Sequence, residues 1–225
     1  MKTAVLGTGT VGRTIAPRLA ELGHIVTVGT RDPEATLART EPDAMGNAPF
    51  GAWAAESPGI TLAGFADAAA GADLIVNATN GGASLDVLAQ AGAENLDGTI
   101  ILDIANPLDF SKGMPPTLLV KDTDSLGEQI QRSYPQTRVV KSLNTLNADL
   151  MAHPDRISDP GTLFVSGNDT DAKDTVTALL KEFGHRDVID LGDITTARGT
   201  EMLLPVWLRL WGALGTPDFN FKIVR

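Results

Sequence analysis

The sequence contains no cysteine, three histidines and one tyrosine among its 225 residues. The lack of cysteine excludes disulfide bonds, thiolate nucleophiles and zinc sites built on thiolates. No Ser-His-Asp arrangement, no paired carboxylates at a strand end and no metal-ligand spacing can be found. We therefore expect no catalytic side chain and no metal, and any redox chemistry must belong to bound cofactors.

Basic residues and long apolar runs are also scarce. The chain has 18 Lys and Arg against 28 Asp and Glu, a net charge of −10, with no basic run, which argues against nucleic-acid or anionic-membrane partners. No stretch approaches 18 uncharged apolar residues, and the first predicted strand begins too early for a signal peptide. We expect a cytoplasmic protein, without a membrane partner, that acts on small molecules.

The strongest motif lies at the start of the chain. A short apolar strand over residues 3–6 leads into Gly7-Thr8-Gly9-Thr10-Val11-Gly12, and an amphipathic helix follows. This is G-x-G-x-x-G in the setting that dinucleotide binding requires. Gly7 permits the tight turn, Gly9 lets backbone N–H groups approach a pyrophosphate, and Gly12 lets the helix lie close to the sheet. The helix N-terminus adds partial positive charge.

The end of the second predicted strand, residues 24–28, indicates which dinucleotide binds. It is followed by Gly29, Thr30 and Arg31, where an NAD enzyme carries a ribose-binding carboxylate. A guanidinium instead favours a 2′-phosphate, so we expect NADP. Asp32 has about the spacing of a ribose carboxylate, but it precedes Pro33 and fits a loop better. The alternative is that Asp32 begins the next turn and Arg31 is only a solvated charge.

Strands and helices alternate along the rest of the chain. Strands are predicted at residues 60–63, 73–79, 99–104, 138–145, 162–166 and 187–191, and helices at 65–70, 84–91, 125–133 and 172–183. This pattern predicts an α/β fold, a Rossmann-type doubly wound, mostly parallel sheet with a small C-terminal helical extension. We expect residues 1–145 to form the NADP-binding domain and residues 146–225 to extend the same compact unit.

Polar residues follow several of the strands. In an open parallel sheet the ligand crevice lies at the carboxyl ends, so Thr79, Asn80 and Gly81 should face the cofactor, and Asn106 should join the same rim. The segment 142–145 points to the same crevice, although Asn144 could also be an ordinary turn residue. The loop of residues 108–124 is the best candidate for a lid.

The apolar stretch near the C-terminus leaves almost no polar face. It comprises Met202, Leu203, Leu204, Val206, Trp207, Leu208, Leu210, Trp211 and Leu214. Such a helix must be buried on all sides, either by its own fold or against a second copy, and we favour a homodimer. Residues 219–223 alternate like a last strand.

Longer segments resemble one protein family. They are GTGTVGRTIAPRLAELGHIVTVGTRDPE (7–34), VNAT (76–79), DIANPL (103–108), VVKSLNT (139–145), SGND (166–169), TTARGTEMLLPVWLRLWG (195–212) and FNFKI (219–223). Together they are similar to the NADPH-dependent deazaflavin (coenzyme F-420) reductase family. The resemblance implies a dimer that transfers hydride reversibly between the nicotinamide and deazaflavin C5.

The resemblance also assigns residues. It implies that the pyrophosphate is bound by Thr8, Gly9, Thr10 and Val11, the 2′-phosphate by Thr30 and Arg31, and that the nicotinamide or the second ring is bordered by Gly81, Asn106, Ser142 and Asn144.

This chain also departs from the family pattern. Family members often carry a further phosphate-binding lysine where this chain has Ala35 and Thr36, and archaeal members carry histidine in place of Asn144. Related ferric reductase domains use NADPH with a flavin, so FAD or FMN is a competing acceptor. A non-catalytic NADP(H)-sensing module is the alternative from another class.

Overall fold

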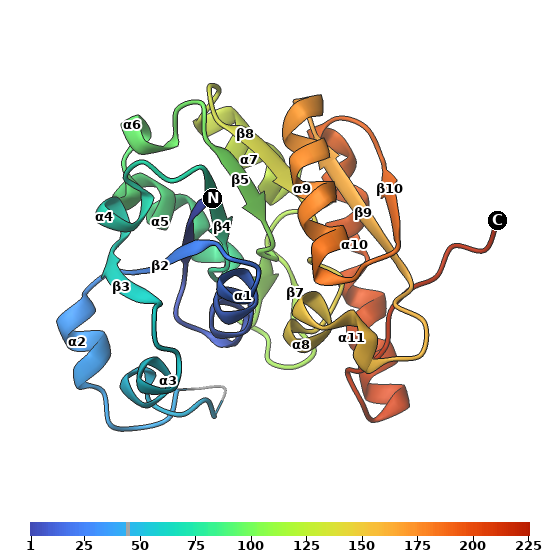
Figure 1. Cartoon of the computed structure of the whole chain (residues 1–225). Helices are drawn as coiled ribbons and strands as arrows, with labels where there is room; N and C mark the ends of the chain where they lie inside the picture. Colours follow the sequence, from blue (N-terminus) through green and yellow to red (C-terminus); the bar gives the residue numbers. More distant parts are fainter. Residues whose placement is uncertain (44–45) are drawn as a thin grey trace.

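The computed structural model describes residues 1–43 and 46–225 of the chain, and a single large sheet organises it (Figure 1). Among the described residues eight strands pair in the order β3-β2-β1-β4-β5-β8-β9-β10. Their bounds are β1 (Lys2–Leu6), β2 (Ile25–Thr30), β3 (Thr61–Gly64), β4 (Leu74–Asn77), β5 (Ile100–Asp103), β8 (Arg138–Lys141), β9 (Thr162–Gly167) and β10 (Asp187–Asp190). β9 runs antiparallel to β8, whereas the other pairs are parallel. The predicted doubly wound, mostly parallel α/β fold is confirmed.

Helices cover both faces of this sheet. In Figure 1, α1 (Thr10–Glu21), α8 (Ala148–Ala152) and α9 (Thr170–Phe183) lie in front of it. The opposite face carries α4 (Phe65–Ala69), α5 (Ser84–Ala91), α7 (Leu126–Ser133) and α10 (Ala197–Met202). The strands are apolar on both faces, as buried parallel strands must be: Val5 and Val76 enter the first core, and Ala4 and Ile75 the second.

Shorter elements complete the chain. They are α2 (Pro33–Ala38), α3 (Phe50–Glu56), α6 (Ala93–Leu96), α11 (Leu204–Leu214), the 3-10 helices η1 (Gly81–Ala83), η2 (Pro154–Arg156) and η3 (Ile194–Thr196), and the strands β6 (Leu108–Asp109) and β7 (Thr117–Leu118). The segment 108–124, expected as a loop, thus contains a short antiparallel ribbon of β6 and β7. The predicted helix over residues 125–133 is present as α7, and Ser125 followed by Glu128 caps it, because the Ser125 hydroxyl accepts a hydrogen bond from the Glu128 backbone N–H at 3.1 Å.

The prediction of a last strand over residues 219–223 is wrong. The backbone of this segment bonds to β9 only at the start of that strand, where the Thr162 N–H donates to the Phe221 carbonyl at 2.8 Å and the Ile223 N–H donates to the Thr162 hydroxyl at 3.0 Å. β10 pairs along β9 from Thr162, and β8 occupies the other side of its far end. Little free edge therefore remains for a new strand.

The apolar C-terminal stretch also differs from expectation. It forms two helices, α10 and α11, which meet near Leu203, with Pro205 in the first turn of α11 where its missing N–H costs nothing. Within α11, Leu204 and Trp207 are buried, but Val206 is 50% and Leu214 57% exposed. The expectation that this helix is buried on all sides is therefore not met within one chain.

A row of buried polar side chains crosses the carboxyl end of the sheet. Asn77, Asp103 and Lys141 are the last residues of β4, β5 and β8, and the strand register sets them side by side. The Asn77 amide donates to one carboxylate oxygen of Asp103 at 2.8 Å, and the Lys141 ammonium donates to the other at 2.8 Å. All three side chains are shielded from solvent.

Glu201, from α10, completes this row. Its carboxylate lies 2.8 Å from Lys141 Nζ and accepts backbone N–H groups of Leu126 and Gly127, in the first turn of α7, at 2.9 and 3.1 Å. Lys141 also donates to the Ala105 carbonyl, so its three N–H donors have three acceptors. Burial acts to lower the pKa of Lys141, but Asp103 and Glu201 outweigh it and hold that pKa above its ordinary value. The network ties α10 and α7 to the sheet.

We expect Lys141→Met to reduce the free energy of unfolding by about 3–5 kcal/mol, because Asp103 and Glu201 would face each other in the interior without a cation. Lys222→Met is the matched control, since Lys222 pairs with Asp159 on the surface at 3.4 Å and its loss should cost less than about 1 kcal/mol. Urea unfolding followed by circular dichroism measures both. Equal losses would contradict the role given to the buried network.

Candidate functional site

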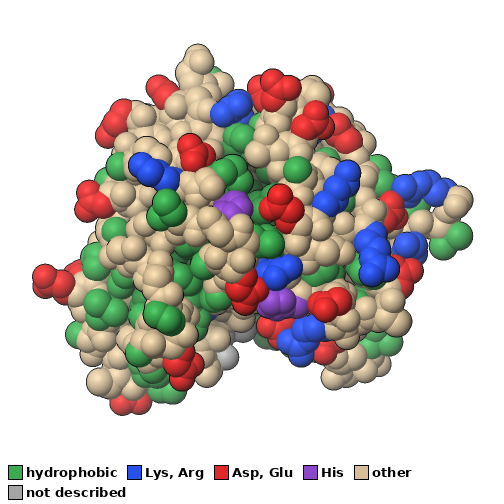
Figure 2. Space-filling model, viewed as in Figure 1, with side chains coloured by type: hydrophobic (Ala, Val, Ile, Leu, Met, Phe, Trp, Pro, Cys, Tyr) green, Lys and Arg blue, Asp and Glu red, His purple; other side chains and the backbone are tan. Residues whose placement is uncertain are grey.

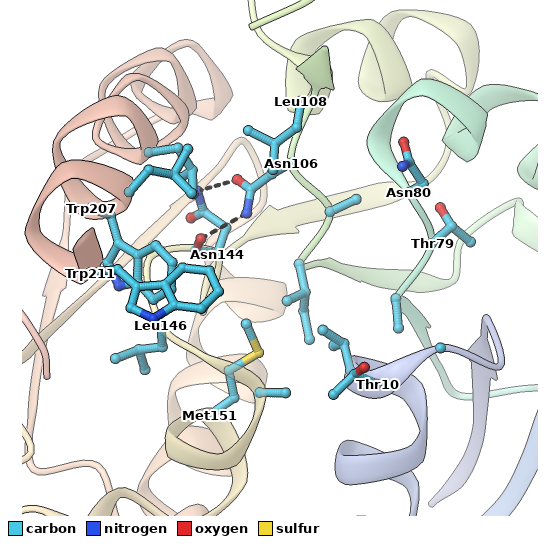
Figure 3. Close-up of a pocket in the computed structure, with 18 of the residues that line it drawn as sticks. Thr10, Thr79, Asn80, Asn106, Leu108, Asn144, Leu146, Met151, Trp207 and Trp211 are labelled. Carbon is cyan, nitrogen blue, oxygen red and sulfur yellow. Dashed lines mark hydrogen bonds between the residues drawn. The ribbon is translucent and has the colours of Figure 1, made fainter. Parts of the chain in front are cut away.

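Two cavities meet at the glycine loop that follows β1. The first, which we call the apolar cavity, has a volume of about 520 Å³ (Figure 3). The second, which we call the polar cavity, has about 480 Å³ and lies between the glycine loop, α2 and the segment leading to α3. Gly9 lines both of them, so the cleft extends to either side of this residue.

The three glycines of the loop have different surroundings. Gly7 has φ +124°, and a Cβ there would lie 2.6 Å from the Ala78 carbonyl oxygen. A Cβ on Gly12 would lie 2.1 Å from the Gly7 carbonyl oxygen, so these two positions exclude a side chain because of the protein's own backbone. A Cβ on Gly9 would meet nothing within 4 Å. The space above Gly9 fits a pyrophosphate held by backbone N–H groups at the start of α1.

Residues around the glycines fix the loop in place. Thr8 lines the polar cavity, whereas Thr10 and Val11 line the apolar one. Arg13 donates to the Thr8 carbonyl at 2.8 Å and also to the Ala48 carbonyl, and its guanidinium lies 5.2 Å from the centre of the Phe50 ring. Burial lowers the pKa of Arg13, while Asp43 acts in the opposite direction. Sequence analysis missed Arg13, which joins the glycine loop to the wall of the polar cavity.

The residues predicted to select the 2′-phosphate end β2. Thr30 is buried and its hydroxyl is 2.9 Å from that of Thr36, while Arg31 is exposed. Neither lines the polar cavity, which instead includes Arg39 at the C-terminal end of α2. Asp32 caps α2, since its carboxylate accepts the Ala35 N–H at 2.9 Å. Asp32 is thus engaged in the turn, and Arg39 is a basic residue that sequence analysis missed.

Of the predicted rim residues, Thr79, Gly81, Asn106 and Asn144 lie at the apolar cavity or directly behind it, and Ser142 does not. Thr79, Asn106 and Asn144 line the cavity, as does Asn80. Gly81 is buried behind them, where a Cβ would lie 2.2 Å from the Asn106 carbonyl oxygen. Glycine is required there because two chain segments approach closely.

Asn106 and Asn144 hold each other at this rim. The Asn106 amide donates to the Asn144 carbonyl at 2.8 Å, and the Asn144 amide donates to the Asn106 side-chain oxygen at 3.0 Å (Figure 3). The Asn144 amide also reaches the Thr200 carbonyl at 3.1 Å. Ser142 lies elsewhere: it is buried and donates to the Phe164 carbonyl at 2.7 Å, so it does not line the cavity.

Aromatic side chains from α11 form one wall of the apolar cavity. In Figure 3, Trp207 and Trp211 lie on one side of the cavity, and Thr79 and Asn80 on the other. The two indole centres are 5.6 Å apart, and Trp207 stacks on Phe219 at 5.4 Å. This wall matches the flat, apolar face of a ring system.

Charged side chains lie outside the apolar cavity. None of the described residues that line the apolar cavity carries an ionisable side chain. No group of three or more metal-ligating side chains, and no helix long and apolar enough to cross a membrane, is found among residues 1–43 and 46–225. On the face in Figure 2, Lys and Arg side chains are interspersed with Asp and Glu. The cavity walls can orient and desolvate a ligand but offer it no acid or base.

Of the three histidines, only His185 is buried. It is only 3% exposed, and its Nε2 donates to the Met151 carbonyl at 3.0 Å. Burial lowers the pKa of this imidazole and favours its neutral form. The histidine supports the backbone of Met151, a residue of the cavity wall, from behind.

Comparison with known proteins gives a consistent picture. Residues 2–107 match a family described as NADP oxidoreductase coenzyme F420-dependent. A protein from Arthrobacter sp. FB24, described as a candidate F420-dependent NADP-reductase, is 66% identical, with a TM-score of 0.96 and full coverage of both chains. The F420-dependent NADP reductase of Methanocaldococcus jannaschii is 29% identical over 93% of this chain and 92% of its own length.

A longer relative is matched as well. The metalloreductase STEAP3 of Rattus norvegicus is 25% identical over 92% of this chain, but the chain spans only 38% of that protein. The glycine loop, the sheet order and the full-length similarity to the Arthrobacter protein agree. The chain belongs to the coenzyme F420-dependent NADP oxidoreductase family, and it is an NADP-dependent oxidoreductase.

Proposed function

We propose that the protein transfers a hydride between NADP(H) and a deazaflavin of the coenzyme F-420 type. The observation that carries this proposal is the pairing of a glycine loop open at Gly9 with an apolar, aromatic-walled cavity free of ionisable groups among the described residues that line it. The pyrophosphate would lie over Gly9, with the adenosine in the polar cavity and the nicotinamide in the apolar one. The two cavities, on either side of one residue, suit the two halves of a dinucleotide.

The second ring would stack against Trp207 and Trp211. We assign residues 1–145 to NADP binding and residues 146–225 to the opposite wall, since α11 supplies the two indoles. The Asn106 amide keeps one N–H that can orient a ring carbonyl, whereas both N–H groups of Asn144 are already bonded and hold Asn106 in place.

Hydride transfer between two rings suits a cavity without acids or bases. NADPH gives up one hydrogen with two electrons to C5 of the deazaflavin, and a proton from water completes the reduced ring. The protein has to hold the rings face to face and exclude water. The chain's own contribution is therefore the tryptophan wall, the polar rim and the glycine loop.

We expect anaerobic mixing of the protein with NADPH and the oxidised deazaflavin to bleach the acceptor while NADPH is consumed. Deuterium at the transferable C4 position of NADPH should appear in the reduced acceptor, because the hydride passes directly between the rings. Stopped-flow absorbance and mass spectrometry measure these two outcomes. FMN and FAD serve as comparison acceptors.

If a folded, NADPH-bound protein reduces neither deazaflavin nor flavin, the proposed reaction is wrong. Tight NADPH binding without any turnover would favour the alternative, a non-catalytic NADP(H)-sensing module. Reduction of flavins alone would keep the hydride transfer and replace the acceptor. The deuterium label separates direct transfer from reduction through solvent.

We infer that Arg31, with Arg39, binds the 2′-phosphate. Arg31→Ala should weaken NADPH binding about 10- to 100-fold and leave NADH binding nearly unchanged, because only NADPH offers a phosphate to the guanidinium. Fluorescence titration gives both dissociation constants. Arg186→Ala removes an exposed arginine at the start of β10 and serves as the matched control. Equal losses for both nucleotides would contradict the assignment.

We also infer that two copies pair through α11. Val206, Leu210 and Leu214 follow one another at four-residue spacing and form one stripe along the helix, beside the stripe that carries Trp207 and Trp211. Val206 and Leu214 are largely exposed in one chain. An antiparallel pair of α11 helices on a two-fold axis would set Val206 of one copy near Leu214 of the other, a self-complementary contact.

We expect the double variant Val206→Glu, Leu214→Glu to convert a dimer into a monomer, with at least about 100-fold weaker association, because carboxylates would be buried at the contact. Sedimentation equilibrium measures the mass and the dissociation constant. Leu37→Glu, at a 49% exposed leucine of α2, is the control and should leave the dimer intact. A monomeric parent protein would rule the pairing out.

A further inference from the structure

A third, smaller cavity continues the apolar cavity toward the surface. This groove has a volume of about 240 Å³ and runs between the β6–β7 ribbon and the start of α11. Leu208 lines both the apolar cavity and the groove. Met114 and Trp211 line the apolar cavity and also a further opening, which Leu208 lines as well. The lining of the groove comprises Pro115, Pro116, Thr117, Leu118, Lys121, Pro205, Leu208 and Arg209.

The groove brings together two cations from distant parts of the chain. Lys121 follows β7 and Arg209 lies in α11, and both are exposed. Neither side chain makes a hydrogen bond or an ion pair with a described residue, and the groove lining includes no acid. The neighbouring Arg132 and Arg198 are instead held by Asp124 and Glu128, at 2.8 Å and 2.5 Å.

This pairing is unusual in a chain with a net charge of −10. Two cations that line one groove raise its positive potential, which an anion bound between them would offset. The apolar cavity, in contrast, has no charged side chain among the described residues that line it. An acceptor with an apolar ring and an anionic tail would satisfy both regions at once.

Arg209 lies on a side of α11 that differs from the side facing the apolar cavity and from the side of the proposed dimer contact. Pro205, Arg209 and Gly212 follow at four- and three-residue spacing and line the groove or the opening beside it. Leu204, Trp207, Leu208 and Trp211 face the apolar cavity. The outer side with Val206, Leu210 and Leu214 remains free for the second copy, so the groove and the proposed dimer contact are compatible.

We propose that Lys121 and Arg209 form a binding site for the phosphate-bearing tail of the hydride acceptor whose ring occupies the apolar cavity, an inference that rests on the proposed function. The ammonium supplies a compact charge, and the guanidinium supplies a planar fork of donors that fits phosphate oxygens. The glycine loop, which would hold the pyrophosphate of NADP, lies at the other end of the apolar cavity. The groove therefore serves the acceptor and not the nucleotide.

The test compares acceptors that share a ring and differ in the tail. FMN and riboflavin form one pair, and the deazaflavin with and without its phosphorylated tail forms the other. In the double variant Lys121→Ala, Arg209→Ala, we expect KM for the phosphate-bearing acceptors to rise roughly tenfold or more, with kcat and the dissociation constant of NADPH unchanged. KM for the tail-less acceptors should stay within twofold.

Lys112→Ala is the matched control, because Lys112 lies between β6 and β7, close in sequence to the groove residues Pro115 and Pro116, but does not line the groove. It should leave every KM unchanged. Lys121→Arg with Arg209→Lys keeps both charges and should restore most of the affinity. Equal changes for phosphorylated and tail-less acceptors, or no change for either, would overturn the proposal.

Binding measurements keep this test separate from the proposed reaction. If no acceptor is reduced, the reaction fails, and equilibrium dialysis of oxidised FMN against riboflavin still examines the groove. A preference for FMN that the double variant abolishes supports the site, and equal affinities overturn it. Inorganic phosphate should compete with FMN and not with riboflavin. Binding of inorganic phosphate without any preference for FMN would reduce the groove to an unspecific anion site and overturn the proposal.

Discussion

The buried contact between Lys141 and its two carboxylates, Asp103 and Glu201, is the constraint on which the site depends. Placing three ionised groups in the interior costs several kcal/mol per ion, and only full pairing offsets this cost. The pairing is full here, because each donor of Lys141 has an acceptor and Glu201 also receives two N–H groups of α7. A shifted α10 would leave charges without partners, so the network allows one position of the C-terminal extension.

This position determines the shape of the apolar cavity. Glu201 is followed, after one turn, by the helix that carries Trp207 and Trp211, and the carbonyl of the preceding Thr200 accepts the Asn144 amide. The same network reaches the other wall, because the Asn77 side-chain oxygen accepts the Thr79 hydroxyl at 2.7 Å. One row of polar residues at the end of the sheet therefore fixes the positions of both walls of the cavity.

Sequence reasoning predicts the parts of this arrangement that local chemistry decides. The glycine loop, the apolar strands and the Ser125 cap each follow from neighbouring residues, and the mostly parallel sheet follows from the alternation of strands and helices. Contacts between residues far apart in the sequence cannot be predicted in this way. Lys141 and Glu201 lie far apart in the sequence, and nothing near either residue indicates that a lysine ending an apolar strand will meet a glutamate in a short helix near the C-terminus. The one available signal was that adjacent strands each end in a polar residue, Asn77, Asp103 and Lys141.

The apolar walls of this cavity were not predicted from the sequence, for a related reason. Its walls include Leu108, Leu146, Met151 and Trp207, which read as ordinary core residues because a ring-binding surface and a protein interior have the same composition. These wall residues differ from core residues because none of the described helices and strands packs against the side that faces the cavity. The sheet end and α11 are held apart by the polar network, so these side chains face a space of about 520 Å³ and not another element. A hydrophobic wall kept open by buried charges can receive a flat ring without closing on itself, and this is the physical basis of the proposed site, which needs no acid or base.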